Sequence, residues 1–564
     1  MTGWGAGSGA GASAGAGTGA VRRAVHGLLL PGFTGTTPPG WLLDAARAGL
    51  AGVVLFAHNT PDLATTTALT ARLHEAAPDL LVATDEEGGD VSRLEAATGS
   101  SLPGAAALGV VDDERLTRAA GEALGRLLAA AGIDLDLAPV LDVDAPGNPV
   151  IGVRAFGTEP AAVARHGVAF ARGLQHGGVG TCAKHFPGHG STTVDSHLAL
   201  PVVDADLDTL RGRDLVPFSA ALAPGAGTDD GPAADALMTA HVVVPALGPA
   251  PASLEPAVAA LARELGHAGP IITDALDMRA VSDGVDVGEA AVRAVEGGAD
   301  LLCLGTTTGR DDEALFRSAV DALVAAVGSG RLTQDRLSAS RRRTESLARR
   351  LRARRDGAGP GAGPGADTGA GTAGRAEAAL AALAEVGAEA ARRAVRAVGP
   401  RAALAGAPDV VDLRLRLDHA AGRTAQHVLR ALAARWPDAV VHPALDDDGV
   451  AALLRGLAGP AVPTRPADAA GAVPGAARPL VVVTREPVPG GPEHARLAVL
   501  QEARPDLVVV HTGAPAAGER WLADLPGGLP ATVLACGTGR ANAEAAVDLL
   551  AGPVPAAGAP GVAR

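Results

Sequence analysis

The sequence of 564 residues contains no tyrosine, four tryptophans and only three cysteines. The cysteines, Cys182, Cys303 and Cys536, lie far apart in apolar stretches, which excludes a disulfide framework and a zinc-finger spacing and predicts small core residues. No run of about 18 apolar residues is free of glycine, proline and charge, so we expect no membrane span. Because aromatic side chains are scarce, recognition of a ligand should rest on charged side chains.

Basic residues are also in deficit. The chain has 48 Lys and Arg against 62 Asp and Glu, which gives a net charge of −14. Its dense basic tract, Arg341 to Arg355, is interpreted as the solvated face of a helix. The sequence therefore predicts no phosphate-neutralising surface and no nucleic-acid partner.

The start of the chain, MTGWGAGSGAGASAGAGTGA, has neither the basic beginning nor the apolar centre of a secretory signal. Its glycine and alanine content predicts a flexible tail over residues 1–22. We therefore expect a cytoplasmic protein.

Short apolar runs alternate with helical patterns over residues 23–355. The runs are apolar on both alternations, as strands buried on both faces should be, and segments 62–76, 161–174 and 311–327 carry helix-forming residues. This pattern predicts an α/β fold with a TIM-type (β/α)₈ barrel, whose chemistry lies at the C-terminal ends of the strands. A doubly wound sheet is the alternative. The runs lie near Leu28, Val53, Val82, Leu135, Ala183, Met238, Ile272 and Leu302.

A glycine- and proline-rich stretch follows the predicted barrel. Residues 356–375 have no apolar period and predict a mobile linker. Residues 376–564 then show a long alanine-rich helix, Glu377 to Val398, and strand candidates separated by helical patterns. They predict a second, open α/β domain with a structural or interaction role, because convergent polar residues are few. The strand candidates are Val410 to Leu413, Ala439 to His442, Leu480 to Thr484, Leu507 to His511 and Thr532 to Ala535.

Polar side chains crowd the ends of five predicted barrel strands. The third strand ends in TDEEGGDVSRL, the fourth runs into DLDLAPVLDVDAPGNPVIGVRAFG, the fifth into KHFPGHGSTTVDSHLALP, the sixth into TAH and the seventh into TDALDM. Single residues have simpler explanations: Asp144 as a cap, Lys184 as the partner of a carboxylate, His241 as a core histidine. Because polar groups at buried strand ends cost free energy unless they are paired or used, five clusters on one rim predict a functional site.

The fifth cluster carries the most specific pattern. Gly188 and Gly190 allow its loop to approach a ligand closely and to move. Asp195 and His197 follow, two residues apart, so in an extended segment the carboxylate reaches the imidazole and orients its tautomer. The pair is a candidate proton shuttle.

These motifs resemble a known family. KHFPGHG followed by DSH, together with DEEGG and TDALDM, is similar to the glycoside hydrolase family 3 β-N-acetylhexosaminidases, which release N-acetylglucosamine from peptidoglycan fragments. The resemblance covers residues 27–350 and implies a retaining, double-displacement hydrolase with a TIM-type barrel and, as in many members, a C-terminal α/β domain. Its substrate would be an N-acetylglucosamine-containing glycoside. No metal-ligand spacing such as HExxH occurs, and no cofactor is expected.

The resemblance also implies roles for individual residues. Asp274 is the implied nucleophile, and the Asp195/His197 pair is the implied general acid/base. Asp277 is a rival nucleophile, but we prefer Asp274 because it falls at the strand terminus. An imidazole with an ordinary pKa of about 6.5 suits acid/base exchange near neutral pH. The implied sugar-binding residues are Asp85, Arg154, Lys184 and His185, with His241 lining the pocket.

Two positions depart from the family pattern. Asp90 stands where the family usually has Arg, which removes one expected sugar contact, although Arg93 is close by and becomes a candidate for binding the sugar. Ser191 stands where Asp is common, in the loop after GHG, and should affect the closure of that loop.

Other functions remain open from the sequence. A phosphorylase on the same scaffold would use phosphate in place of water, and a sugar-binding protein would have lost catalysis. The presence of Asp274, Asp195 and His197 argues against the second of these. A β-glucosidase is disfavoured because those relatives lack KHFPGHG followed by DSH. The sequence does not predict the aglycone or the oligomeric state.

Overall fold

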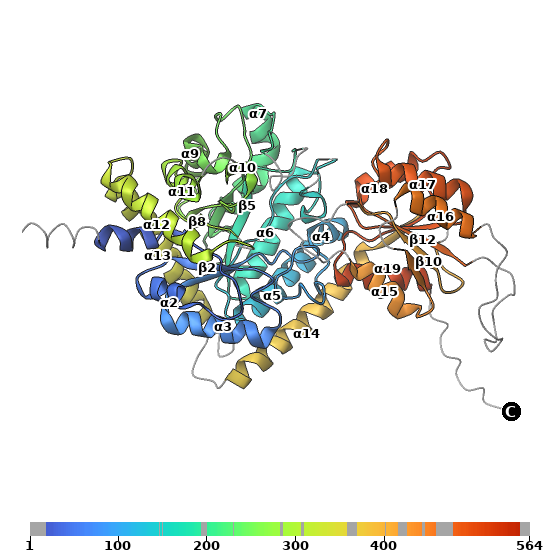
Figure 1. The fold of residues 1–564 in the computed structure, drawn as a ribbon, viewed down its shortest axis with the longest axis horizontal. Coiled ribbons are helices and arrows are strands. Elements are labelled where there is room, and N and C mark those ends of the chain that lie inside the picture. The colour runs from blue at the N-terminus through green and yellow to red at the C-terminus, as the bar shows by residue number, and fades with distance from the viewer. Residues whose placement is uncertain are drawn as a thin grey trace, which may run out of the picture. The chain divides into compact units, whose positions relative to one another are not determined.

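The computed structural model describes residues 19–145, 147–148, 150–192, 200–228, 230–282, 286–305, 309–357, 369–400, 402–415, 426–442, 446–457 and 478–552 (Figure 1). The chain divides into two compact units. The barrel unit comprises residues 1–87, 91–97 and 112–386, and the C-terminal unit comprises residues 88–90, 98–111 and 387–564. Two short stretches after the third strand thus belong to the C-terminal unit, which the boundaries predicted from the linker do not include.

Parallel strands form the centre of the barrel unit. Strands β2 to β7 make one sheet in sequence order, and β1 pairs with β8. A bridge between Ile272 and Leu301 and a hydrogen bond from the Val54 N–H to the Pro31 carbonyl close the ring. The predicted strands and the (β/α)₈ barrel are confirmed. The strands are β1 (Leu29–Leu30), β2 (Gly52–Leu55), β3 (Leu81–Thr84), β4 (Leu135–Asp136), β5 (Gly180–Phe186), β6 (Ala236–Thr239), β7 (Ile271–Thr273) and β8 (Leu302–Cys303).

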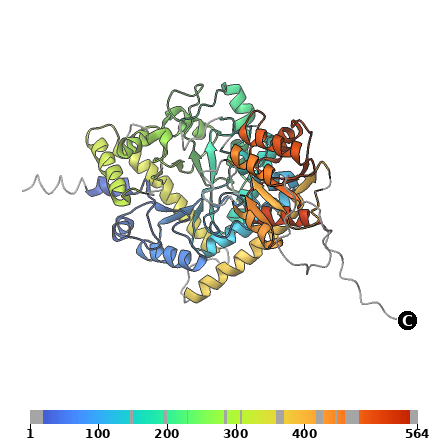
Figure 2. The same cartoon turned by 45° about the vertical axis from the view of Figure 1, so that its right-hand side comes forward.

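Helices surround these strands (Figure 2). Asp62, Asp113 and Asp311 begin three of them by accepting backbone N–H groups of the first turn. Across the described ranges, no helix has the length and apolarity needed to cross a membrane. Residues 19–26 are helical, so the flexible tail predicted over residues 1–22 is wrong from residue 19 onward. The other helices of this unit include α2 (Gly40–Arg47), α3 (Leu63–Ala76), α5 (Glu114–Ala130), α6 (Pro160–His176), α7 (Leu207–Thr209), α8 (Leu215–Leu222), α9 (Pro256–Glu264), α10 (Arg279–Ser282), α11 (Val287–Glu296), α12 (Asp312–Gly328), α13 (Gln334–Gly357), the 3-10 helices η1 (Gly152–Arg154) and η3 (Ala252–Leu254), and the π-helix η2 (Leu210–Asp214).

The core of the barrel includes one of its helices. Leu347 and Leu351 of α13 pack in the same cluster as the inward-facing side chains of the strands. A Cβ on Gly180, the first residue of β5, would lie 2.6 Å from a methyl group of Leu351, so α13 covers the N-terminal ends of the strands. Cys182 and Cys303 belong to this cluster and are unpaired, which confirms their prediction as small core residues.

Arginines of α13 form ion pairs with buried carboxylates at the starts of three strands. These carboxylates stand just before β4, β6 and β8, where burial makes an unpaired charge costly. The interpretation of the basic tract as a solvated face is therefore wrong for the arginines that reach them. The pairs are Arg355 with Asp134 at 2.5 Å, Arg354 with Asp235 at 2.8 Å, Arg350 with Asp235 at 3.2 Å and Arg343 with Asp300 at 3.1 Å.

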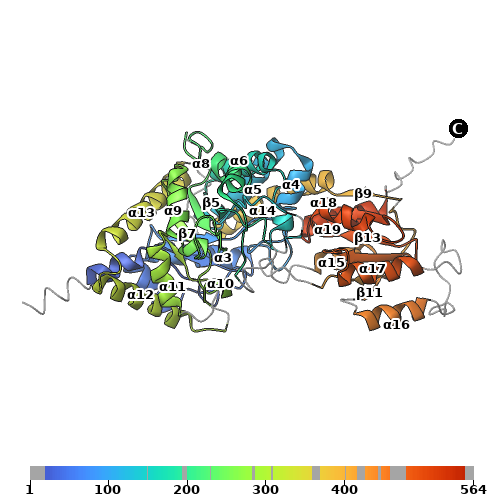
Figure 3. The same cartoon turned by 90° about the horizontal axis from the view of Figure 1, so that it is seen from above.

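The C-terminal unit is an open α/β sandwich. Its sheet has the order β11-β10-β12-β13-β14-β9, parallel except for β9. Helices α15 and α19 cover one face of this sheet, and α16, α17 and α18 cover the other (Figure 1). Figure 3 shows α16 beside β11, at one edge of the unit. The predicted strands and open architecture are confirmed. The elements are α4 (Ala105–Val111), β9 (Arg396–Val398), β10 (Asp409–Asp412), α15 (His427–Arg435), β11 (Val440–His442), α16 (Asp447–Leu457), β12 (Leu480–Thr484), α17 (Pro492–Ala503), β13 (Val508–His511), α18 (Pro515–Ala523), β14 (Ala531–Leu534) and α19 (Arg540–Ala551).

The helix predicted from Glu377 to Val398 is wrong at its end. Helix α14 (Gly369–Ala394) stops at Ala394, and Arg396–Val398 pair with β14 as strand β9. This pairing satisfies backbone groups along the edge of β14, a long-range gain that the local helical pattern does not reveal. The helix also begins inside the predicted linker, of which residues 358–368 lie outside the described residues.

Candidate active site

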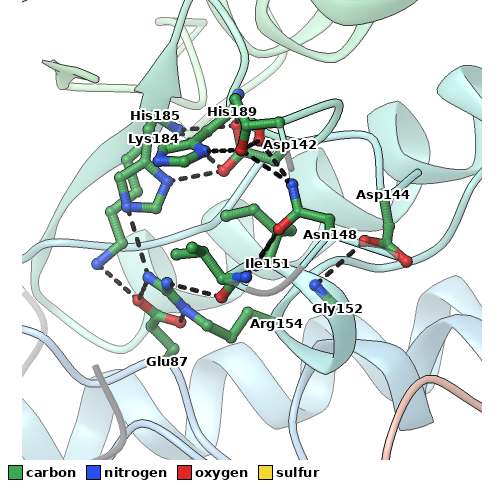
Figure 4. Close-up of polar contacts among 12 residues, drawn as sticks. Glu87, Asp142, Asp144, Asn148, Ile151, Gly152, Arg154, Lys184, His185 and His189 are labelled. Atoms are coloured by element: carbon green, nitrogen blue, oxygen red, sulfur yellow. Dashed lines mark hydrogen bonds and ion pairs between the residues drawn. The ribbon is translucent and has the colours of Figure 1, made fainter. Parts of the chain in front are cut away.

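Polar side chains from the C-terminal ends of barrel strands converge on one rim (Figure 4). Asp85 and Glu87 follow β3, Asp142 follows β4, and Lys184 and His185 lie near the end of β5. The 3-10 helix η1 adds Arg154. Because the C-terminal ends of parallel strands share one face of a barrel, residues distant in the sequence meet there.

Glu87 is the centre of a buried ion network. Its Oε1 lies 2.7 Å from Lys184 Nζ and 2.8 Å from Arg154 Nη2. Its Oε2 accepts a hydrogen bond from Arg154 Nε at 2.8 Å. Lys184 Nζ also donates to Asp85 Oδ1 at 2.6 Å, and Arg93 Nη2 lies 3.5 Å from the other oxygen of Asp85. Three cations and two carboxylates thus share the site.

The network keeps its carboxylates ionised. Burial alone would raise the pKa of Asp85, but Lys184 and Arg93 outweigh burial and hold that pKa below its usual value. Burial acts likewise on Glu87, and Arg154 and Lys184 hold its pKa well below the ordinary range. The side chain of Asp85 is 19% exposed and that of Glu87 only 6%. A ligand on the rim therefore reaches Asp85, while Glu87 holds the two cations in place.

Asp142 is fully buried and organises the KHFPGHG loop. Its Oδ2 lies 2.7 Å from His185 Nδ1, and its Oδ1 accepts a hydrogen bond from the His189 N–H at 2.7 Å. Burial favours the neutral acid, but His185 and His189 lower the pKa of Asp142 below its usual value. A carboxylate at Nδ1 fixes the proton of a neutral imidazole there, so His185 presents Nε2, 3.4 Å from Arg154 Nη2, as an acceptor.

The loop is also fixed beyond His185. Burial and the neighbouring His185 lower the pKa of His189 to about 4, while Asp142 and Asp274 oppose this shift. His189 is therefore neutral at pH 7. Asn148 Nδ2 donates to the His189 carbonyl at 2.9 Å, and Thr192 Oγ1 lies 2.8 Å from His189 Nδ1.

Asp274 directly follows β7 and is half-buried. Its N–H donates to the Thr239 carbonyl at 3.1 Å, and its Oδ1 accepts from the Ala275 N–H at 2.8 Å. Its carboxylate interacts electrostatically with His189, so it lies near the KHFPGHG loop. A partly exposed carboxylate at a strand end is placed to attack a ligand on the rim.

His241 is completely buried. Its Nδ1 lies 2.6 Å from Ser253 Oγ and its Nε2 lies 2.9 Å from the Ala275 carbonyl oxygen. Because Ala275 follows Asp274, the imidazole fixes the backbone next to that carboxylate. These contacts fix the orientation of the His241 ring, and its place in the lining of the pocket stays a prediction.

Asp277, the rival of Asp274, is held at the end of β8. A Cβ added to Gly305 would lie 1.8 Å from Asp277 Oδ1, so the carboxyl group packs directly against this glycine. The close approach fits a role in holding the strand end.

The proposed proton shuttle, Asp195 and His197, lies outside the described residues and stays a prediction. Ser191, which departs from the family pattern, accepts a hydrogen bond from Arg213 Nη2 at 3.2 Å. This bond connects the KHFPGHG loop to η2.

Asp90, the other departure, belongs to the C-terminal unit. Its Oδ2 lies 2.7 Å from Arg485 Nη1, and its Oδ1 accepts from the Thr538 N–H at 2.6 Å. The side chain is buried, so an arginine at this position would face Arg485 with like charge. The structure thus accounts for an acidic residue here.

Sequence reasoning missed Glu87, Asp142 and His189. All three occur in the polar clusters after β3, β4 and β5, so the strand-end pattern contained the signal. The pattern did not indicate which carboxylate pairs with which cation. These pairs join residues far apart in the sequence, such as Arg154 and Glu87, which are 67 positions apart.

The rim offers both acceptors and donors to a ligand. Asp85 accepts hydrogen bonds, while Lys184 and Arg154 donate them. Such a mixture suits a polyhydroxylated ligand, whose hydroxyl groups donate and accept.

Comparison with known proteins identifies relatives. Residues 43–347 match the family described as glycosyl hydrolase family 3 N terminal domain. The chain is 34% identical over 345 residues to Beta-hexosaminidase A of Pseudoalteromonas piscicida, a match that covers 56% of each chain and so just over half of that relative. It is 37% identical over 335 residues to a beta-hexosaminidase of Xylella fastidiosa, covering 55% of this chain and 94% of the relative.

A solved structure shares the fold of both units. It is a glycoside hydrolase family 3 beta-N-acetylglucosaminidase from a Paenibacillus species, with a TM-score of 0.74 and 30% sequence identity. The similarity covers 94% of this chain and 96% of that structure.

Proposed function

The chain belongs to glycosyl hydrolase family 3, and from this we propose that it hydrolyses β-linked N-acetylglucosaminides. Its relatives are named beta-hexosaminidase and beta-N-acetylglucosaminidase, and these names support N-acetylglucosamine as the sugar. The observation that carries the activity is the placement of Asp274 on the rim, near a loop that is fixed to the ion network of Asp85, Glu87, Lys184 and Arg154.

In the proposed mechanism, the Asp274 carboxylate attacks the anomeric carbon while His197 protonates the departing oxygen. A covalent glycosyl-enzyme forms. His197, oriented by Asp195, then removes a proton from water, and the water displaces Asp274 from the opposite face of the sugar. Two displacements retain the configuration of the anomeric carbon.

The other residues would bind the sugar. Asp85 accepts hydrogen bonds from sugar hydroxyls, and Lys184 and Arg154 donate to them. Glu87 holds both cations, so their ammonium and guanidinium groups are preorganised before the substrate arrives. Arg93 and the Nε2 atom of His185 complete the proposed set.

The activity is tested with aryl glycosides in phosphate buffer and in a non-coordinating buffer. We expect turnover of the N-acetyl-β-glucosaminide, slower turnover of the β-glucoside, and free N-acetylglucosamine in both buffers. Sugar 1-phosphate as the main product in phosphate buffer would make the protein a phosphorylase. Binding of the sugar without turnover would make it a sugar-binding protein.

For the biological substrate we propose N-acetylglucosaminyl fragments of peptidoglycan in the cytoplasm. The three cysteines are buried and unpaired, as is usual in a reducing compartment. Turnover of disaccharide fragments of peptidoglycan, compared with that of chitobiose, tests the substrate. Fractionation of the native source tests the location.

A further inference from the structure

A hollow of about 580 Å³ lies in the barrel unit away from the rim. It is lined by the end of α8, the turn before β7 and one face of α13. Asp235, which directly precedes β6, and Gly269, which stands two residues before β7, form part of its wall. The hollow is therefore at the N-terminal ends of these strands, whereas Asp274 follows the C-terminal end of β7.

Positive charge dominates the surroundings of this hollow. Arg342, Arg343 and Arg350 of α13 line it. Two buried carboxylates nearby, Asp235 and Asp300, are shared among more arginines than they can neutralise. The shared contacts are Arg350 and Arg354 with Asp235, and Arg263, Arg336 and Arg343 with Asp300.

The other titratable groups that line the hollow change its excess of positive charge little. Asp230 lines the hollow and adds one carboxylate. His267 also lines it, but burial lowers its pKa to about 4, so it is neutral at pH 7. In a chain with a net charge of −14, an excess of guanidinium groups at one hollow attracts anions.

Two of the lining arginines are placed to bind a ligand. Arg342 is exposed, and no ion pair is recorded for it among the described residues. Arg350 is 44% exposed and meets Asp235 through a single 3.2 Å contact, whereas Arg354 reaches both oxygens of the same carboxylate. Arg350 is therefore free to turn toward a second anion while Asp235 stays paired.

From this geometry we propose that the hollow between α8 and α13 binds a small molecule carrying a phosphate group. A guanidinium group matches the geometry of phosphate oxygens and forms paired, charge-assisted hydrogen bonds with them. Glycine and alanine residues at positions 266, 268 and 269 leave space for the remainder of the molecule. The volume lies within the range of about 300 to 1,000 Å³ typical of small-molecule sites.

The test is calorimetric titration of the full chain with inorganic phosphate at low ionic strength. We expect saturable binding that Arg342→Glu weakens at least tenfold, because the change replaces a lining cation with an anion. Arg349→Glu is the matched control: it makes the same charge change on the same helix, at an exposed residue that does not line the hollow, and should bind like the native chain.

Circular dichroism of both variants establishes that they fold. Equal phosphate affinity in the native chain and in Arg342→Glu would place binding elsewhere, including the catalytic rim, and would overturn the proposal. The absence of saturable binding in the native chain would overturn it as well.

Discussion

Replacement of Glu87 by Gln tests the ion network of the rim most directly. The substitution keeps the shape of the side chain but removes the charge that faces Lys184 Nζ at 2.7 Å and Arg154 Nη2 at 2.8 Å. Asp85 would then have to balance both cations. Breaking a buried pair by removing one partner costs about 3 to 5 kcal/mol, since an uncompensated charge remains buried. We expect the thermal unfolding midpoint of the barrel unit to fall by several degrees.

Glu289→Gln is the matched control for this experiment. Glu289 also binds two cations, Arg293 at 2.9 Å and Arg331 at 2.9 Å, but its side chain is 36% exposed. Water and salt screen such surface pairs, so their loss should change stability far less. Scanning calorimetry measures both variants. An equal loss of stability in Glu87→Gln and Glu289→Gln would refute the argument from burial.

The pH dependence of the same comparison gives a second check. Although burial opposes it, Arg154 and Lys184 hold the pKa of Glu87 below its unfolded value of about 4.3. A depressed pKa stabilises the folded chain above the unfolded pKa, and this stabilisation disappears as pH falls through the folded pKa. The stability gap between the native chain and Glu87→Gln should therefore be constant from pH 7 to about 5 and shrink below that range. A gap that widens on acidification would contradict the assignment.

Three further predictions concern the proposed catalytic machinery. Asp274→Ala should leave the chain folded and abolish turnover, and a slow fluorinated sugar should label Asp274 of the native chain, as measured by mass spectrometry. Activity of the variant within about tenfold of the native activity, or a label on Asp277, would exclude Asp274 as the nucleophile. His197→Ala should impair substrates with poor leaving groups far more than activated aryl glycosides, and equal losses across a leaving-group series would exclude it as general acid. Asp142→Asn should lower kcat/KM about 10- to 100-fold and shift its pH profile, because the carboxylate that fixes the His185 tautomer is lost; an unchanged profile would leave Asp142 a purely structural role.

The strands and the polar rim were predictable because burial produces a pattern in the local sequence. A parallel strand covered on both faces is a short apolar run, as in GVVL of β2, and a polar cluster at the end of such a run costs free energy unless it is used. These signals need no knowledge of which residues meet.

The pairings were not predictable because they join residues far apart in the chain. Arg355 looks like a surface arginine until the fold brings it to Asp134, 221 positions away. Strand β9 continues a helical pattern and pairs with β14 only in the folded unit. The role of Asp90 depends likewise on Arg485, which follows it by 395 positions.

The division of the chain also has a consequence for biosynthesis. Residues 88–90 and 98–111 leave the ribosome early, yet they belong to a unit whose remaining residues begin at position 387. The hydrogen bond from the Thr538 N–H to Asp90 spans 448 positions, and that from Arg540 to the Gly99 carbonyl spans 441. The two stretches can pair with each other early, through the hydrogen bond from the Gly89 N–H to the Leu102 carbonyl. Their contacts with Thr538 and Arg540 form only after those residues have been made, and contacts of such separation form late. A cut between α13 and α14 would leave residues 88–90 and 98–111 on the N-terminal product, without the rest of their unit. The C-terminal product would lack these same residues, so neither unit can be exchanged as a self-contained module.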